Sequence, residues 1–110
     1  MKKNILCSLT FILFASNANA TGSYIVIDGI ITSISNTRSN ENSFTVSVSG
    51  GVGSCKDSTI IFPLSAAGTP EVHERAYSSA LTAFVSGLKV KIHNYSGDNC
   101  DTASYIRLSK

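Results

Sequence analysis

The chain has 110 residues, of which 43% are hydrophobic and 15% charged, and its formal net charge is +2. This length suits one small domain and is too short for two. Of nine basic residues, Lys2 and Lys3 lie in the first 20 positions, which leaves seven basic and seven acidic residues in the rest. Balanced charge argues against nucleic-acid binding, which draws much of its affinity from neutralising phosphates, and against attachment to anionic membranes.

The first 20 residues have the pattern of a secretory signal. Two lysines precede an apolar run, and Ala18-Asn19-Ala20 is the small-x-small pattern that signal peptidase cuts. The apolar run, of roughly ten residues, is too short to span a bilayer, so an uncleaved anchor is the less favoured alternative. We therefore expect residues 1–20 to be removed and residues 21–110 to be secreted or periplasmic, without membrane insertion.

Two cysteines remain beyond the signal, Cys55 and Cys100. In an exported protein such a pair most simply forms one disulfide. A bridge that closes a loop of about 45 residues stabilises the fold by about 4 kcal/mol in the chain-entropy model. The alternative is two free thiols or metal ligands, but the chain has no CxxC motif and no nearby histidine pair to complete a zinc site. We expect a Cys55–Cys100 disulfide, no metal and no cofactor.

Three strands are predicted in the first half of the mature chain. Residues 21–34 are rich in β-branched side chains and predict one long strand, bent at Gly29. Residues 36–42 are polar and indicate a loop. Residues 43–49 alternate between apolar and polar side chains, which predicts a half-buried strand. A third, shorter strand is predicted at residues 59–64.

The hydrophobic period then changes to that of a helix. Thr69 can cap this helix, Pro70 suits its first position, and Gly87 ends it. The predicted apolar stripe comprises Val72, Ala76, Tyr77, Ala80, Leu81, Phe84 and Leu88. Two further strands are predicted at residues 89–95 and 104–108, on either side of a polar loop that contains Cys100.

Three strands, one helix and two strands, in that order, predict a mainly β domain. The expected fold is an OB-fold, a five-stranded Greek-key barrel with one helix between strands 3 and 4, and we expect the barrel to be closed. The alternative is an open α+β sheet with the helix on one face. In an OB barrel the third and fifth strands are parallel neighbours, so their beginnings lie at the same end. Cys55 precedes the third strand and Cys100 the fifth, so this fold brings the two cysteines together.

No motif in the chain indicates an enzyme. His73 and His93 are the two histidines, and no nucleophile-elbow motif accompanies them. Asp98, Asn99 and Asp101 offer oxygen ligands for calcium, but their spacing matches no standard loop, so a solvated turn is the favoured interpretation. We therefore expect a protein without catalytic residues.

The tyrosines are more informative. Tyr24, Tyr95 and Tyr105 lie near predicted strand ends in polar surroundings, with Asp28 and Asn94 close in sequence. A tyrosine ring packs on the apolar C–H face of a sugar, while Asp and Asn side chains form hydrogen bonds with its hydroxyls. The alternative is that these tyrosines serve only in packing. The predicted glycan contacts are Tyr24, Asp28, Asn94 and Tyr95.

Two stretches of the chain carry a resemblance. The first is Asp-Gly-Ile-Ile-Thr-Ser-Ile at residues 28–34, and the second lies in residues 80–92, with Ala80-Leu81, Ser86-Gly87 and Val90-Lys91-Ile92. Together they resemble the first strand, the helix end and the fourth strand of the binding subunits of bacterial toxins with one A and five B subunits. The most similar branch is that of subtilase cytotoxin and the typhoid and pertussis-like toxins.

This resemblance implies an exported OB-fold subunit that forms a ring, usually a pentamer, and binds sialylated glycans on host cells beside a toxin A subunit. The family's sugar site uses the polar residue before the first-strand glycine, where close relatives have serine and this chain has Asp28. An acid there is unfavourable beside a sialic acid carboxylate, which favours a neutral sugar or none. The family also uses a tyrosine just past the fourth strand, where this chain has Asn94 followed by Tyr95. No feature of the chain identifies an A subunit.

Two other functions remain open at this point. An envelope OB-fold that mediates protein–protein association would bind no small ligand. It would be monomeric and would not bind glycans. Nucleic-acid binding by the barrel face is a common use of this fold, but the balanced charge argues against it.

Overall fold

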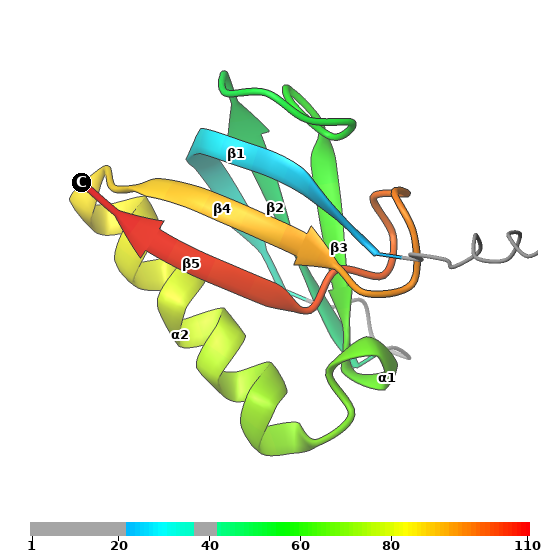
Figure 1. Cartoon of the computed structure of the whole chain (residues 1–110). Coiled ribbons are helices and arrows are strands. Elements are labelled where there is room, and N and C mark those ends of the chain that lie inside the picture. Colours follow the sequence, from blue (N-terminus) through cyan, green and yellow to red (C-terminus); the bar gives the residue numbers. More distant parts are fainter. Residues whose placement is uncertain (1–21, 37–41) are drawn as a thin grey trace, which may run out of the picture.

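The computed structural model describes residues 22–36 and 42–110. The predicted signal at residues 1–20 and most of the predicted loop at residues 36–42 lie outside the described residues. The elements are β1 (Ser23–Ser35), β2 (Ser43–Ser49), β3 (Thr59–Pro63), α1 (Leu64–Ala67), α2 (Pro70–Ser86), β4 (Lys89–Asn94) and β5 (Tyr105–Ser109). The predicted mainly β fold, with its long helix between strands 3 and 4, is confirmed (Figure 1).

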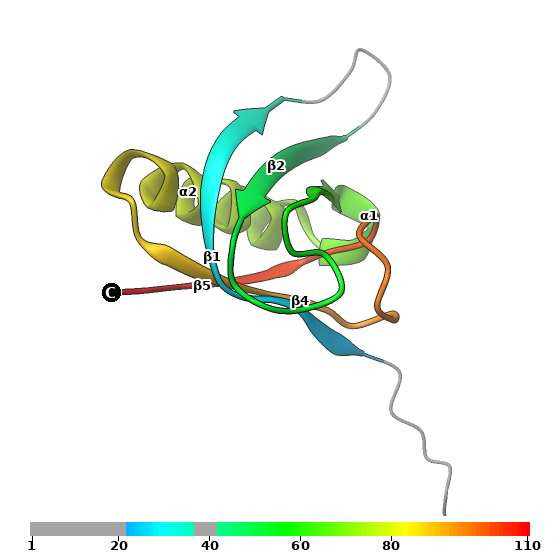
Figure 2. The same cartoon turned by 90° about the horizontal axis from the view of Figure 1, so that it is seen from above.

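The five strands form one antiparallel sheet in the order β3-β2-β1-β4-β5, an OB-like arrangement. Long β1 occupies the centre because it pairs with β4 through its first half and with β2 through its second half. The sheet curls strongly, as the view from above shows (Figure 2). Among the described strands, β3 and β5 form no ladder with each other, so the expected closure of the barrel is wrong.

Two backbone hydrogen bonds bridge the opening between the two edge strands. The Ile61 amide donates to the carbonyl of Cys100 at 2.8 Å, and the Ala103 amide donates to the carbonyl of Ile61 at 3.1 Å. The polar segment before β5 therefore runs along β3 where a fully closed barrel would have a ladder. This satisfies the Ile61 amide and carbonyl, which would otherwise be exposed on an edge strand.

The bend of β1 lies where the sequence predicts it. The register with β4 shifts between Ile27 and Gly29, which is the signature of a β-bulge. The extra residue is Asp28, whose φ of 63° lies in the left-handed region. A Cβ on Gly29 would lie 2.7 Å from Cγ1 of Val26, so glycine is required here because of close packing.

The core lies between the curled sheet and α2. Phe44 and Phe62 stack with their ring centroids 4.7 Å apart, and α2 packs on the sheet through Ala76, Ala80 and Ala83. These small side chains bring the helix close to the strands. The helix prediction is therefore partly wrong, because two members of the predicted stripe, Leu81 and Phe84, are 43% and 42% exposed. They lie to one side of the alanine face that contacts the core.

The ends of α2 agree with the sequence prediction. The hydroxyl of Thr69 accepts a hydrogen bond from the amide of Val72 at 3.2 Å, and Gly87 ends the helix with a left-handed φ of 68°. The four-residue helix α1 was not predicted, since its sequence is too short to show a period. None of the described helices is long and apolar enough to cross a membrane.

Replacing Thr69 with alanine should lower the free energy of unfolding by about 1 kcal/mol, because the first turn of α2 loses its side-chain cap. Urea denaturation measures this change. Thr82→Ala is the control, since the Thr82 hydroxyl donates to the carbonyl of Ser78 within the helix and caps no end. An equal loss in both variants would contradict the capping role.

The predicted disulfide is present. Cys55 and Cys100 are bonded, with their Cα atoms 5.9 Å apart. Cys55 is fully buried, and its amide donates to the carbonyl of Ile25 at 2.9 Å. The bridge therefore ties the β2–β3 loop, the first half of β1 and the segment before β5 into one corner of the molecule.

Candidate functional site

Strand alternation gives the β1–β4–β5 part of the sheet two different faces. In β4, Val90, Ile92 and Asn94 point into the core, while Lys91 and His93 point to the other side. The outward residues have outward partners, because Tyr24 pairs with His93 on one side of β4 and Tyr105 pairs with His93 on the other. This outer surface lies on the side of the sheet away from the core and α2 (Figure 1).

Four rings meet on this surface. His93 lies at their centre, with its ring centroid 4.7 Å from that of Tyr24, 4.5 Å from that of Tyr95 and 6.3 Å from that of Tyr105. Tyr24 and Tyr105 also contact each other edge to face, at 6.3 Å. Tyr24 is 47% exposed and Tyr95 61% exposed. We call this surface the aromatic face; it comprises Tyr24, Lys91, His93, Tyr95, Tyr105 and Arg107.

Cations accompany the rings. Nζ of Lys91 lies 5.1 Å from the centroid of the Tyr24 ring, a cation–π distance. Arg107 pairs with Lys91 across β4 and β5. Neither β4 nor β5 contains an acidic residue. The balanced charge of residues 21–110 therefore conceals a locally basic surface.

His93 is held in place from below. A Cβ on Gly22 would lie 2.8 Å from Cε1 of His93, so the ring packs directly on the chain that leads into β1. Nδ1 of His93 is buried and has no hydrogen-bond partner among the described residues. A buried N–H without a partner is rarer and more costly than an unpartnered acceptor, so we place the proton of the neutral ring on Nε2. The ring then has its donor on Nε2.

The structure brings together only part of the predicted contact set. Tyr24 and Tyr95 both contact His93. Asp28 is exposed in the bulge of β1, next to the pair formed by Ile27 and Lys91, and thus at the margin of the aromatic face.

Asn94, the fourth predicted contact, is fully buried beneath this surface. Its amide nitrogen donates to the carbonyl of Asn99 at 2.9 Å and to the hydroxyl of Thr102 at 2.8 Å, and its oxygen accepts from the amide of Ser96 at 2.8 Å. The side chain is therefore not available as a direct surface contact. Instead it fixes the loop that begins with Tyr95.

The loop after β4 uses its polar groups internally. The side-chain oxygen of Asn99 accepts from the amide of Asp101 at 2.9 Å and from the hydroxyl of Thr102 at 3.2 Å. These bonds fit the solvated turn that the sequence favoured. In the part of the chain that the structure describes, no three His, Cys, Asp or Glu side chains lie close enough to hold a metal ion.

Sequence reasoning missed His93, Lys91, Tyr105 and Arg107 as members of one surface. A signal for them was present, because Lys91 and His93 alternate with buried residues in β4, and Tyr105 and Arg107 alternate with the apolar Ile106 and Leu108 in β5. The missing information was the pairing of β1, β4 and β5, which places the two alternating pairs beside Tyr24.

Comparison with known proteins adds the family but not the chemistry. No curated protein and no solved structure matches the chain. One family model matches residues 5–110, nearly the whole sequence. The chain therefore belongs to this family, DUF5992, a family of unknown function.

Proposed function

We propose that this protein is an exported glycan-binding module, and that its aromatic face takes a sugar with an acidic group. The observation that supports this most is the meeting of Tyr24, His93, Tyr95 and Tyr105 beside two cations. Exposed tyrosine rings offer apolar surfaces to the C–H face of a pyranose. Lys91 and Arg107 supply the charge for a carboxylate or sulfate.

The cations change the expected charge of the sugar. Asp28 alone favours a neutral ligand, because a carboxylate repels an acidic sugar. In the structure Asp28 lies at the margin, while Lys91 is close to the ring of Tyr24. The aromatic face therefore favours an anion over its centre and disfavours one near the β1 bulge.

The resemblance to toxin binding subunits supports the same proposal. Such a subunit would be exported, would assemble into a ring, usually a pentamer, and would present its sugar sites to host cells beside an A subunit. The disulfide suits an oxidising extracellular or periplasmic compartment. The exposed apolar side chains of Leu81, Phe84 and Val85 on α2 offer a surface for self-association.

A glycan array probed with the exported, disulfide-intact protein tests the proposal. We expect binding to sialylated or sulfated glycans, with about a tenfold loss of affinity in Tyr24→Ala and in Lys91→Gln, which corresponds to about 1.4 kcal/mol. Asp28→Asn should bind acidic glycans at least as well as the wild type, since it removes a negative charge at the margin.

The control is Lys56→Gln, which removes a cation from the exposed β2–β3 loop. There Nζ of Lys56 lies 4.0 Å from Oδ2 of Asp57. This variant should bind like the wild type. No binding to any glycan, or an equal loss of glycan affinity in Lys91→Gln and Lys56→Gln, would contradict the proposal. An oligonucleotide on the same array tests nucleic-acid binding, since rings with cations also suit single strands; preference for it over every sugar would favour that function.

Protein–protein association without a small ligand is the second candidate function. The uncharged, exposed side chains of Leu81, Phe84 and Val85 favour it, because charged residues are depleted at the centres of protein interfaces. Light scattering separates the two functions. A ring supports the toxin-like proposal, whereas a monomer that is silent on the array and captures an envelope protein supports association alone.

A further inference from the structure

A second surface, away from the aromatic face, has the form of a binding groove. Three hollows adjoin at the end of the barrel where β2 begins and β3 ends, with volumes of about 450, 450 and 320 Å³. Ser43 lines each of the three, and we call them together the depression. Volumes of about 300–1,000 Å³ are typical of small-molecule sites.

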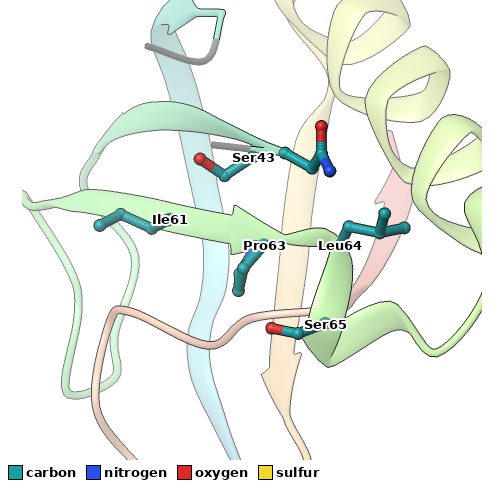
Figure 3. Close-up of a pocket in the computed structure, with 6 residues that line it drawn as sticks. Ser43, Ile61, Pro63, Leu64 and Ser65 are labelled. Carbon is teal, nitrogen blue, oxygen red and sulfur yellow. The ribbon is translucent and has the colours of Figure 1, made fainter. Parts of the chain in front are cut away.

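The two ends of this depression differ in chemistry. At one end, Figure 3 shows Ser43 on β2 across from Ile61 and Pro63 of β3, with Leu64 and Ser65 at the start of α1. At the other end the lining comes from Phe44 and from one face of α2. We call this second end the α2 groove; it comprises Asn36, Ser43, Phe44, His73, Glu74, Tyr77 and Ser78.

Helix geometry explains why the α2 residues converge. His73 and Tyr77 are four residues apart, as are Glu74 and Ser78, so all four lie on one face over two turns. The Tyr77 ring stands edge to face on Phe44, with the centroids 5.1 Å apart. A wall of two aromatic rings thus lies beside a carboxylate, an imidazole and a hydroxyl.

The hydrogen-bonding roles in the α2 groove follow from one contact. Nε2 of His73 lies 2.9 Å from the carbonyl oxygen of Phe62. A carbonyl only accepts, so Nε2 is the nitrogen that donates to it. The Glu74 carboxylate is the charged acceptor of the α2 groove, and the described lining contains no lysine or arginine.

We propose that the α2 groove is a second saccharide site, and that it takes a neutral sugar. Sugar hydroxyl groups donate to a carboxylate such as that of Glu74, while the phenol of Tyr77 supplies a ring edge and a hydroxyl. A ligand with an acidic group is disfavoured by Glu74. The two sites therefore have opposite charge preferences: the aromatic face prefers an acidic sugar and the α2 groove a neutral one.

Saturation-transfer NMR on the exported, disulfide-intact protein tests this site with methyl β-galactoside and methyl β-glucoside as probes. We expect saturation of at least one of these glycosides. It should fall at least fivefold in Glu74→Gln, which weakens the acceptor, and should be absent in Ser78→Arg, which fills the α2 groove from an exposed helix position.

Glu71→Gln is the matched control, since Glu71 lies one turn earlier on the same helix and lines none of the three adjoining hollows. It should leave the signal unchanged, as should Tyr24→Ala on the aromatic face. Unchanged thermal midpoints show that the variants are folded. No saturation of either glycoside, equal loss in Glu71→Gln, or saturation of spermidine in their place would overturn the proposal. Loss in Tyr24→Ala alone would assign the neutral sugar to the aromatic face.

Discussion

Serine in place of both Cys55 and Cys100 should lower the free energy of unfolding by about 4 kcal/mol. The bridge joins residues 45 positions apart in sequence, so its removal returns a large loop entropy to the unfolded chain. The backbone bond from Cys55 to Ile25 does not involve sulfur, so the substitution leaves it in place. A small domain with a modest core has few other sources of stability of this size.

Urea denaturation of the wild type, the double serine variant and the reduced wild type measures this effect. Reduction alone should give nearly the whole loss, because it cuts the bridge without changing the side chains. The variant Ser54→Ala is the control, since the Ser54 hydroxyl donates to the carbonyl of Asp98 at 2.8 Å in the same corner. A loss below 1 kcal/mol on reduction would show that the corner is held by its hydrogen bonds instead.

Gly51→Ala should destabilise the protein by about 3 kcal/mol, and Gly50→Ala by only about 1 kcal/mol. The two glycines have nearly the same φ, 75° and 76°, so alanine costs both the same left-handed strain. They differ in space, because a Cβ on Gly51 would collide with the carbonyl of Ile27, whereas one on Gly50 would meet nothing within 4 Å.

The collision occurs where the β2–β3 loop crosses the first half of β1. Ile27 and Val52 exchange two backbone hydrogen bonds there, at 2.8 and 3.0 Å. Gly51→Ala should push this loop away and weaken both bonds, which hydrogen exchange at the amides of Ile27 and Val52 would detect. If the two alanine variants unfold at the same urea concentration, the crossing contributes nothing to stability.

Local signals predicted the elements well because they act within a few residues. The hydroxyl of Thr69 and the left-handed Gly87 set the ends of α2, and the alternation in residues 43–49 sets β2. Closure of the barrel was beyond such reasoning. In place of a β3–β5 ladder, Ile61 meets Cys100 and Ala103, a contact between distant segments that leaves no local pattern in the sequence.

The buried face of α2 shows a second limit. A stripe at helical spacing predicted that Leu81 and Phe84 face the core together with Ala76 and Ala80. The two alanines do so, but Ala83 joins them in place of the two larger residues. Periodicity shows which side of a helix is apolar. It does not show which residues of that side pack most closely on the sheet. Close packing on a sheet favours small side chains, and the larger ones are then left at the flank.

A surface cluster of tyrosines was predictable from the sequence, but its full membership was not. Tyrosines near strand ends indicated a sugar surface, and Tyr24 and Tyr95 do meet through His93. Asn94 was misjudged because it occupies an inward position of β4, one residue from outward His93. Neighbouring residues of a strand point to opposite faces of the sheet. Proximity in sequence therefore does not show which side chains share a surface.

Labelling the tyrosine rings with carbon-13 tests the central claim most directly, because the chain has four tyrosines. Three belong to the aromatic face, and Tyr77 lines the α2 groove. Titration with a sialylated trisaccharide should shift the ring signals of Tyr24, Tyr95 and Tyr105 saturably and leave those of Tyr77 in place. Shifts confined to Tyr77, or no shift at any ring, would contradict the assignment of acidic glycan binding to the aromatic face.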